Sequence, residues 1–194
     1  GDHMAIELSS DLALSGRVVV AGGAYGIEAA AHQSALATGG RTIAVLAGGV
    51  DRAYPAGHAD LFARIEQQGL LVSEVAPGVA PTRQRFLDRG RIMAALSSTT
   101  VIVEAGARSG SLRVANEAVE LGRSVGAVPG PVTSAASYGS NILIQDRRAR
   151  LLTGSEDVLR LADEDKSNAH NPELARAFRI AAACDRRSPD SRGL

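Results

Sequence analysis

The chain has few of the residues that build redox sites, zinc clusters and aromatic surfaces. Cys184 is the only cysteine in 194 residues, which excludes an internal disulfide and a cysteine zinc cluster. Tryptophan is absent, and three tyrosines and three phenylalanines are too few for a broad stacking surface. The formal net charge is zero, so bulk charge attracts neither nucleic acid nor a membrane. No apolar run reaches the roughly 18 residues that a membrane-spanning helix needs.

Glycine and arginine, by contrast, are abundant. The chain holds 21 glycines, above the usual share of about 7%. Lys166 is the only lysine among 21 basic residues. A guanidinium group suits bidentate contacts to phosphate better than an ammonium group does, so this bias favours a phosphate-bearing ligand. A GC-rich genome would produce the same bias.

Short apolar runs alternate with stretches of helical periodicity along most of the chain. The runs are continuously apolar, as strands buried on both faces of a parallel sheet are. We therefore predict an α/β fold, a Rossmann-like doubly wound and mostly parallel sheet with helices on both faces. The expected strands are 18–20, 42–46, 70–72, 101–103, 124–128 and 151–152. The expected helices are 25–38, 61–68, 88–97, 112–121 and 155–162, with a polar loop over 74–86.

The composition also suggests how the chain divides. Residues 1–3, which precede Met4, resemble a tag remnant. Residues 4–162 are expected to form one Rossmann-like domain. Charged and polar residues dominate 163–194, so we expect a polar C-terminal tail with a helix over 172–183 and disorder in the last ten residues.

Ligands of open parallel sheets bind at the carboxyl ends of the strands, which directs attention to the loops there. Residues 21–26 form a glycine-rich loop before a helix, and 104–111 form a second loop of the same kind. Backbone N–H groups and the positive end of a helix make such loops suitable for anions, although a tight turn explains one loop alone equally well. Residues 129–131 and 139–141 are candidates for another wall of the same pocket.

Residues 83–91 carry four arginines against one acid, in an otherwise neutral chain. Phe86 lies within this segment. Guanidinium groups bind the phosphates of a nucleic acid, and a flat ring stacks on an unpaired base. The alternative is a solvated loop and helix start that carries internal ion pairs.

Catalytic and metal-binding patterns are weak by comparison. His32 is best interpreted as a structural histidine, and Glu104, at a strand end, either catalyses or braces its loop. The sequence shows no metal-ligand spacing and no nucleophile elbow. We therefore predict no catalytic residue, no metal site and no cofactor.

Taken together, the motifs resemble the DNA-processing protein A family, DprA or Smf, over about residues 16–160. The matching segments are 22–28 with His32, 42–46 with Asp51 and 54–55, 73–74, Phe86 with 89–92, 103–105, 109–112, 122–123, 128–130 and 139–144. Their number and order make the resemblance far more specific than one glycine loop.

The resemblance implies an extended Rossmann-like fold and a cytoplasmic homodimer that binds single-stranded DNA. It further implies recruitment of the RecA recombinase during recombination or natural transformation, and a protein that is not an enzyme. The DNA-binding residues that it implies are Gly22, Gly23, Tyr25, Arg83, Phe86, Arg89, Arg91, Ser109, Gly110, Ser111 and Asn141.

The chain departs from the family pattern in several places. Tyr25 stands where the family usually has Arg, Glu28 for Asp, Gly90 for Asn and Val114 for Thr. The chain is also expected to lack the family's first strand with its Gly-Ser-Arg loop, and the helical and winged-helix domains of many members. These departures bear on DNA affinity and RecA loading more than on the fold.

Two alternatives remain open. The paired loops resemble, more distantly, those of nucleoside-monophosphate phosphoribohydrolases (the LOG family), in which Glu104 would act on an N-glycosidic bond. Release of free base from AMP would indicate that activity. A nucleotide sensor, stabilised by mononucleotides and not by oligonucleotides, is the other alternative.

Overall fold

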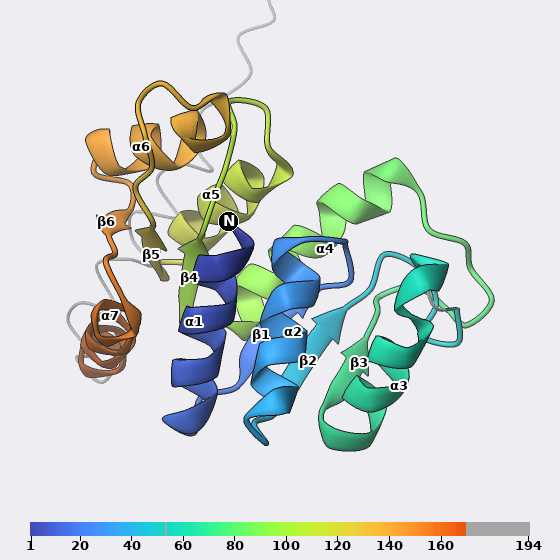
Figure 1. Cartoon of the computed structure of the whole chain (residues 1–194). Coiled ribbons are helices and arrows are strands. Elements are labelled where there is room, and N and C mark those ends of the chain that lie inside the picture. The colour runs from blue at the N-terminus through green and yellow to red at the C-terminus, as the bar shows by residue number, and fades with distance from the viewer. Residues whose placement is uncertain (53, 170–194) are drawn as a thin grey trace, which may run out of the picture.

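The computed structural model describes residues 1–52 and 54–169 of the chain. Within them, six parallel strands form two three-stranded sheets (Figure 1). The first sheet has the order β1 (Val19–Gly22), β2 (Thr42–Val45) and β3 (Leu70–Val72). The second has the order β4 (Thr99–Ile102), β5 (Ser124–Ala127) and β6 (Arg150–Leu151). Every strand pair is parallel, so the predicted α/β class and parallel pairing are confirmed.

Helices cover both faces of the first sheet. In Figure 1, α1 (Asp2–Leu14), α2 (Ile27–Ala37) and α3 (Ala59–Gln68) lie side by side in front of it. A short 3-10 turn, η1 (Ala56–His58), precedes α3. Helix α4 (Arg83–Leu96) packs behind β1 and β2. The core of this half is aliphatic, with Phe62 and Ile65 buried against Ala44 and Leu46.

The second sheet is covered in the same manner. Helix α5 (Gly110–Glu120) packs on β4 and β5 and also against α4, which joins the two halves. Helix α6 (Tyr138–Gln145) follows the 3-10 turn η2 (Ala135–Ser137), and α7 (Ser155–Ala169) packs on β4, β5 and α1. Small residues such as Ala94, Ala115 and Ala118 lie at the α4–α5 contact and let the helices approach closely.

A cavity of about 720 Å³ separates the two sheets. Strand β1 pairs only with β2, and β4 only with β5, so both strands have an unpaired edge. Residues 18–21 and 98–103 line the cavity from these two strands, with apolar side chains of α1, α4 and α7 around them. No strand lies between β1 and β4 in the described residues.

Two helices that were not expected, α1 and α6, and the start of α4 differ from the prediction. No helix was expected before residue 16, yet α1 spans Asp2–Leu14 and buries Leu8 in a cluster with Val158 and Leu161 of α7. Helix α4 begins at Arg83, five residues before the expected start, so the polar loop is shorter than predicted. The Thr82 hydroxyl accepts from the Arg85 backbone N–H and so caps α4. The first residues of α4, 83–85, are polar and show no apolar periodicity, so the sequence pattern did not predict that the helix begins at Arg83.

The structure describes residues 1–3 and only the first part of 163–194, the two ends of the chain for which we made predictions. Asp2 and His3, assigned to a tag remnant, lie in α1, and the assignment stays a prediction. Helix α7 continues to Ala169, beyond the expected end at 162 and into the predicted polar tail. The predicted helix over 172–183 and the disordered last ten residues lie outside the described residues.

Candidate nucleic-acid interface

The glycine-rich loop over 21–26, at the carboxyl end of β1, is called the glycine turn below. Arg89 of α4 lies directly beneath it. A Cβ atom on Gly22 would stand 2.3 Å from the Arg89 guanidinium carbon, so a side chain there would displace the guanidinium from its present position. Arg89 is 4% exposed. Its guanidinium donates to the Glu28 carboxylate at 2.7 Å and to the Val45 carbonyl at 3.0 Å. The turn, the start of α2 and the middle of α4 are thus held together by one buried cation.

Glu28 connects this cation to the turn itself. Its carboxylate oxygen also accepts from the backbone N–H of Ala24, at 2.7 Å. Both partners of the Arg89–Glu28 pair are therefore hydrogen-bonded beyond the pair, as a largely buried ion pair requires. The Arg89 Nε atom is buried and has no hydrogen-bond partner in the described structure. The cavity between the sheets reaches this side chain.

His32 of α2 ties the same turn to β2 from the other side. Its Nε2 atom lies 2.8 Å from the Gly22 carbonyl, and Nδ1 lies 2.7 Å from the Thr42 hydroxyl. Burial lowers the pKa of His32 below its usual 6.5, against the opposing effects of the Gly22 carbonyl and Glu28. A neutral ring bonded to a carbonyl carries its proton on Nε2. The Thr42 hydroxyl beside Nδ1 also lies 2.8 Å from the Val19 carbonyl, to which it donates. The prediction of a structural role agrees with this geometry.

We expect the free energy of unfolding to fall as the pH drops below about 6.5, because of His32. Its lowered pKa means that the unfolded chain binds the proton more readily than the folded chain. The stabilisation is therefore present above pH 6.5 and is lost as the pH falls through the folded-state pKa. Urea denaturation at pH 8 and pH 5.5 measures it. Asp157, with its pKa lowered to about 2, titrates below this window.

The control is His32→Gln, which keeps two polar atoms and does not titrate. This variant is expected to be less stable at pH 8 and to lose less stability between pH 8 and pH 5.5. An identical pH dependence in both proteins would show that another group is responsible.

Aromatic side chains gather above the glycine turn. The Phe86 ring lies over the Arg89 guanidinium, 4.7 Å from ring centroid to Cζ, in cation–π geometry. Tyr54 meets Phe86 edge to face, with centroids 5.7 Å apart. Tyr25 packs against His58 at 4.3 Å, and His58 Nδ1 lies 3.0 Å from the Gly23 carbonyl. This half-exposed aromatic group lies at the carboxyl ends of β1 and β2.

The serine loop after β4 reaches the same cavity. Ser109 caps α5, and its hydroxyl lies 2.7 Å from the Ser111 hydroxyl. Residues 109–111 line the cavity together with Phe86 and Arg89, so the two predicted loops converge on one space. The N-terminus of α5 lies at this point, where the Ser109 hydroxyl accepts from the Ser111 backbone N–H.

Asn141 has a different environment. Its side-chain amide donates to the Gly130 carbonyl at 2.9 Å and accepts from the Gly130 N–H at 3.1 Å. It therefore braces the loop over 129–131 against α6, and it does not line the cavity. Its predicted DNA contact stays a prediction.

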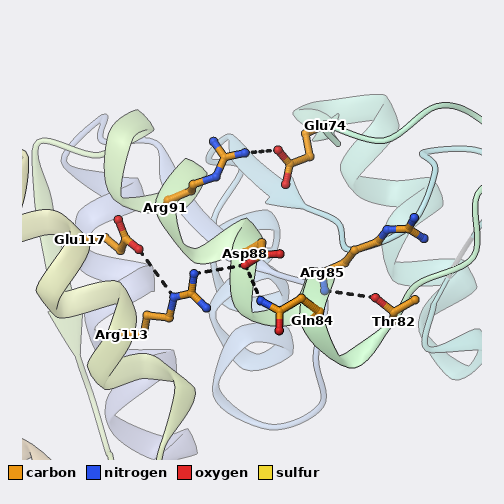
Figure 2. Close-up of polar contacts among 8 residues, drawn as sticks. All are labelled: Glu74, Thr82, Gln84, Arg85, Asp88, Arg91, Arg113 and Glu117. Atoms are coloured by element: carbon orange, nitrogen blue, oxygen red, sulfur yellow. Dashed lines mark hydrogen bonds and ion pairs between the residues drawn. The ribbon is translucent and has the colours of Figure 1, made fainter. Parts of the chain in front are cut away.

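Arg83 and Arg91 lie on the exposed surface of α4, unlike Arg89. Arg91 is 53% exposed on its side chain and pairs with Glu74 across from α4 (Figure 2). Arg83 is also exposed. Exposed ion pairs are worth about 0–1 kcal/mol, so an incoming phosphate can replace Glu74 as the partner of Arg91.

The rest of the arginine segment takes part in internal contacts, as the alternative interpretation expected. Asp88 accepts from Gln84 at 2.8 Å and from Arg113 of α5 at 3.1 Å (Figure 2). Arg85 donates to the Ala80 carbonyl at 2.6 Å. Within the segment, the arginines paired with carboxylates are Arg89, with Glu28, and Arg91, with Glu74. The exposed arginines, Arg83 and Arg91, lie at its two ends.

Two departures from the family pattern lie against each other. A Cβ atom on Gly90 would stand 2.9 Å from a Val114 methyl group, so α4 and α5 touch through a glycine and a valine here. Tyr25, the third departure, extends toward Gly57, where a Cβ atom would stand 2.5 Å from its hydroxyl oxygen. Each of these departures therefore fits its own surroundings.

Sequence reasoning missed three residues of this region. Glu28 was noted only as an acid, because no local pattern pairs it with an arginine 61 positions away. Tyr54 lies in the family-matching segment 54–55, and His58 is a titratable residue, but no local pattern assigns either of them a contact in this site. The described residues hold no group of three or more His, Cys, Asp or Glu suited to a metal. None of the described helices is long and apolar enough to cross a membrane.

The fold and site define a Rossmann-like protein with two anion-suited loops and an arginine–aromatic segment at the carboxyl ends of its strands. The family model described as DNA recombination-mediator protein A matches residues 1–163. The chain belongs to this family, as the sequence motifs predicted.

Curated relatives agree with this assignment. The chain is 52% identical over 159 residues to a DNA processing protein DprA of Mycobacterium tuberculosis, covering 82% of this chain and 41% of that protein. It is 43% identical to DprA of Streptococcus pneumoniae over 142 residues, which are 73% and 50% of the two chains. The chain thus spans half or less of the length of these relatives.

Solved structures support the same fold. The X-ray structure of Streptococcus pneumoniae DprA superposes with a TM-score of 0.75 at 38% identity, covering 82% of this chain and 56% of that chain. DprA of Helicobacter pylori, described for its single-stranded DNA binding mode, gives 0.76 at 28% identity, with 84% and 74% covered. The names of these relatives describe DNA processing and, for the Helicobacter pylori protein, single-stranded DNA binding. The absence of an enzymatic activity stays a prediction.

Proposed function

We propose that this chain is a single-stranded DNA-binding module of the recombination-mediator type. The observation that carries the proposal is the convergence of Phe86, Arg89 and the Ser109–Ser111 loop on the glycine turn after β1. An aromatic ring, a helix N-terminus and exposed guanidinium groups are the components of a sequence-tolerant single-strand site. The Helicobacter pylori relative, named for this binding mode, supports the same conclusion.

The site residues have distinct roles in this proposal. Arg83 and Arg91, exposed on α4, contact phosphates, and Glu74 releases Arg91 when the strand arrives. Phe86 stacks on a base. The loop over 109–111 presents the Ser109 and Ser111 hydroxyls and the start of α5 to a further phosphate.

Arg89 differs from the other two arginines in what it touches. Arg89 is buried and forms an ion pair with Glu28, so its charge is not available to a phosphate. It instead positions the Phe86 ring and the glycine turn. Gly22, Gly23 and Tyr25 shape the wall of the site at the carboxyl end of β1. Asn141 acts indirectly in this proposal, by bracing the loop over 129–131.

The wider role is also a proposal. The family description, a DNA recombination mediator, supports recruitment of RecA onto the bound strand, in recombination or natural transformation in the cytoplasm. The unpaired edges of β1 and β4 are able to pair with another chain, so a homodimer is proposed as well. The solution mass with and without oligo-dT tests the dimer, and loading of purified RecA onto the complex tests recruitment.

We expect binding of oligo-dT to weaken steeply as salt increases, because each neutralised phosphate releases counterions. Removing one phosphate contact reduces the slope of log K against log salt by about 0.7 for a single strand. Arg83→Ala and Arg91→Ala should each produce such a reduction. Titration of a labelled oligo-dT at several salt concentrations measures this slope.

The matched control is Arg160→Ala, which removes an exposed arginine of α7 that pairs with Asp157. It should leave the slope unchanged. Binding that is indifferent to salt and to both α4 substitutions would contradict the proposal. A thermal shift with mononucleotides but not with oligo-dT would favour the nucleotide sensor, and release of base from AMP the LOG-like enzyme.

A further inference from the structure

Tyr54 leaves much of its ring in solvent at the edge of the proposed site. It is 52% exposed, in a chain that has only six aromatic residues. It belongs to none of the buried core clusters of the described residues. Its ring contact is with Phe86, at an interplanar angle of 66°. A large ring placed in this manner adds little to the core, and it is available to a ligand.

The two rings form a corner. In an edge-to-face pair the second ring stands nearly upright beside the face of the first, so a flat group that stacks on one ring meets the edge of the other. The Arg89 guanidinium lies over the Phe86 ring, 4.7 Å from its centroid, and supports it. Because Arg89 is paired to Glu28 and bonded to Val45, this support is rigid. The corner between the two rings is therefore accessible to solvent at Tyr54, and the Phe86 ring contacts a guanidinium group that is held in place.

We propose that Tyr54 and Phe86 together hold one unpaired base, with Tyr54 as a base-contacting residue. This inference rests on the proposed function and names the part of the ligand that this place takes: a planar nucleobase and not a phosphate. Bases within a duplex are stacked on each other and cannot enter the corner. Tyr54 therefore contributes to preference for single strands, which charge alone does not provide.

Two oligomers of equal length test the inference: oligo-dT, and an abasic deoxyribose-phosphate strand with the same charge. Tyr54→Ala should weaken oligo-dT binding about tenfold, the size expected for the loss of one stacked base. It should leave the salt slope and the binding of the abasic strand unchanged. Tyr54→Phe, which keeps the ring, should bind oligo-dT as the parent does.

The matched control is Tyr138→Ala, which removes a tyrosine of α6 that is 55% exposed and lies outside the cavity lining. It should change neither affinity. Equal weakening on both oligomers, or no weakening on oligo-dT, would overturn the inference. If the parent protein binds neither oligomer, the proposed function itself fails, and the two failures are thus distinguishable.

A second measurement avoids any change at Tyr54. The chain has no tryptophan and three tyrosines, so Tyr25→Phe with Tyr138→Phe leaves Tyr54 as the only tyrosine. Stacking on a base should quench its fluorescence on addition of oligo-dT, and the abasic strand should not. Unchanged fluorescence at saturating oligo-dT would overturn the inference.

Discussion

Replacing Glu28 by leucine is expected to lower the free energy of unfolding by about 3–5 kcal/mol, the usual result of removing one partner of a buried ion pair. Arg89 would keep its charge at 4% exposure, with only the Val45 carbonyl to accept from it. The Ala24 N–H would lose its acceptor as well. Urea denaturation at pH 7.5 measures the loss.

The double variant Glu28→Leu/Arg89→Met provides the control. Because it removes the cation together with its partner, it should recover much of the lost stability, as apolar replacements of buried ion pairs often do. If the double variant is no more stable than Glu28→Leu, the buried charge of Arg89 is not the source of the loss. Such a result would indicate that the loss of stability comes from the missing hydrogen bond between the Ala24 N–H and Glu28.

The loss of Phe86 should have the largest effect on DNA binding. Phe86→Ala is expected to weaken oligo-dT binding by about ten- to a hundredfold, corresponding to about 1–3 kcal/mol for a stacked base. The substitution also removes the ring that covers the Arg89 guanidinium. Phe86→Tyr keeps both interactions and should retain most of the affinity. Fluorescence anisotropy with labelled oligo-dT measures both variants.

Combining this substitution with Tyr54→Ala tests whether the two rings act as one site. Since they touch and hold the same base in our proposal, the double variant should lose less affinity than the two single losses added together. Strict additivity would show that the rings bind independently. An unaltered affinity in Phe86→Ala itself would remove the aromatic ring from the proposed interface.

Local patterns in the sequence were sufficient for most of the fold. The continuously apolar runs predicted the strands, with β3 matching at both ends and the others within two residues. The glycine and serine loops were placed correctly at the carboxyl ends of β1 and β4. Helix α1 was not predicted, because residues 1–3 were assigned to a tag remnant and the first expected strand begins only at residue 18.

The arginine segment shows where local patterns stop being informative. Arg89 and Arg91 are two positions apart, so a helix turns them about 200° away from each other, onto opposite faces. Their types are identical, and nothing nearby in the sequence distinguishes the one beneath Gly22 from the one that reaches Glu74. Only the packing of α4 behind β1 and β2 made one of them buried and the other exposed.

The sequence by itself determined the order of elements, the position of the ligand-suited loops and the family, because strand burial, glycine turns and motif order are recorded in neighbouring residues. The tertiary structure decided which charged side chains pair within the protein and which remain accessible to a ligand. It paired Glu28 with Arg89 and brought Tyr54 against Phe86. Contacts across 61 and 32 positions depend on how sheets and helices pack, and a single sequence does not display them.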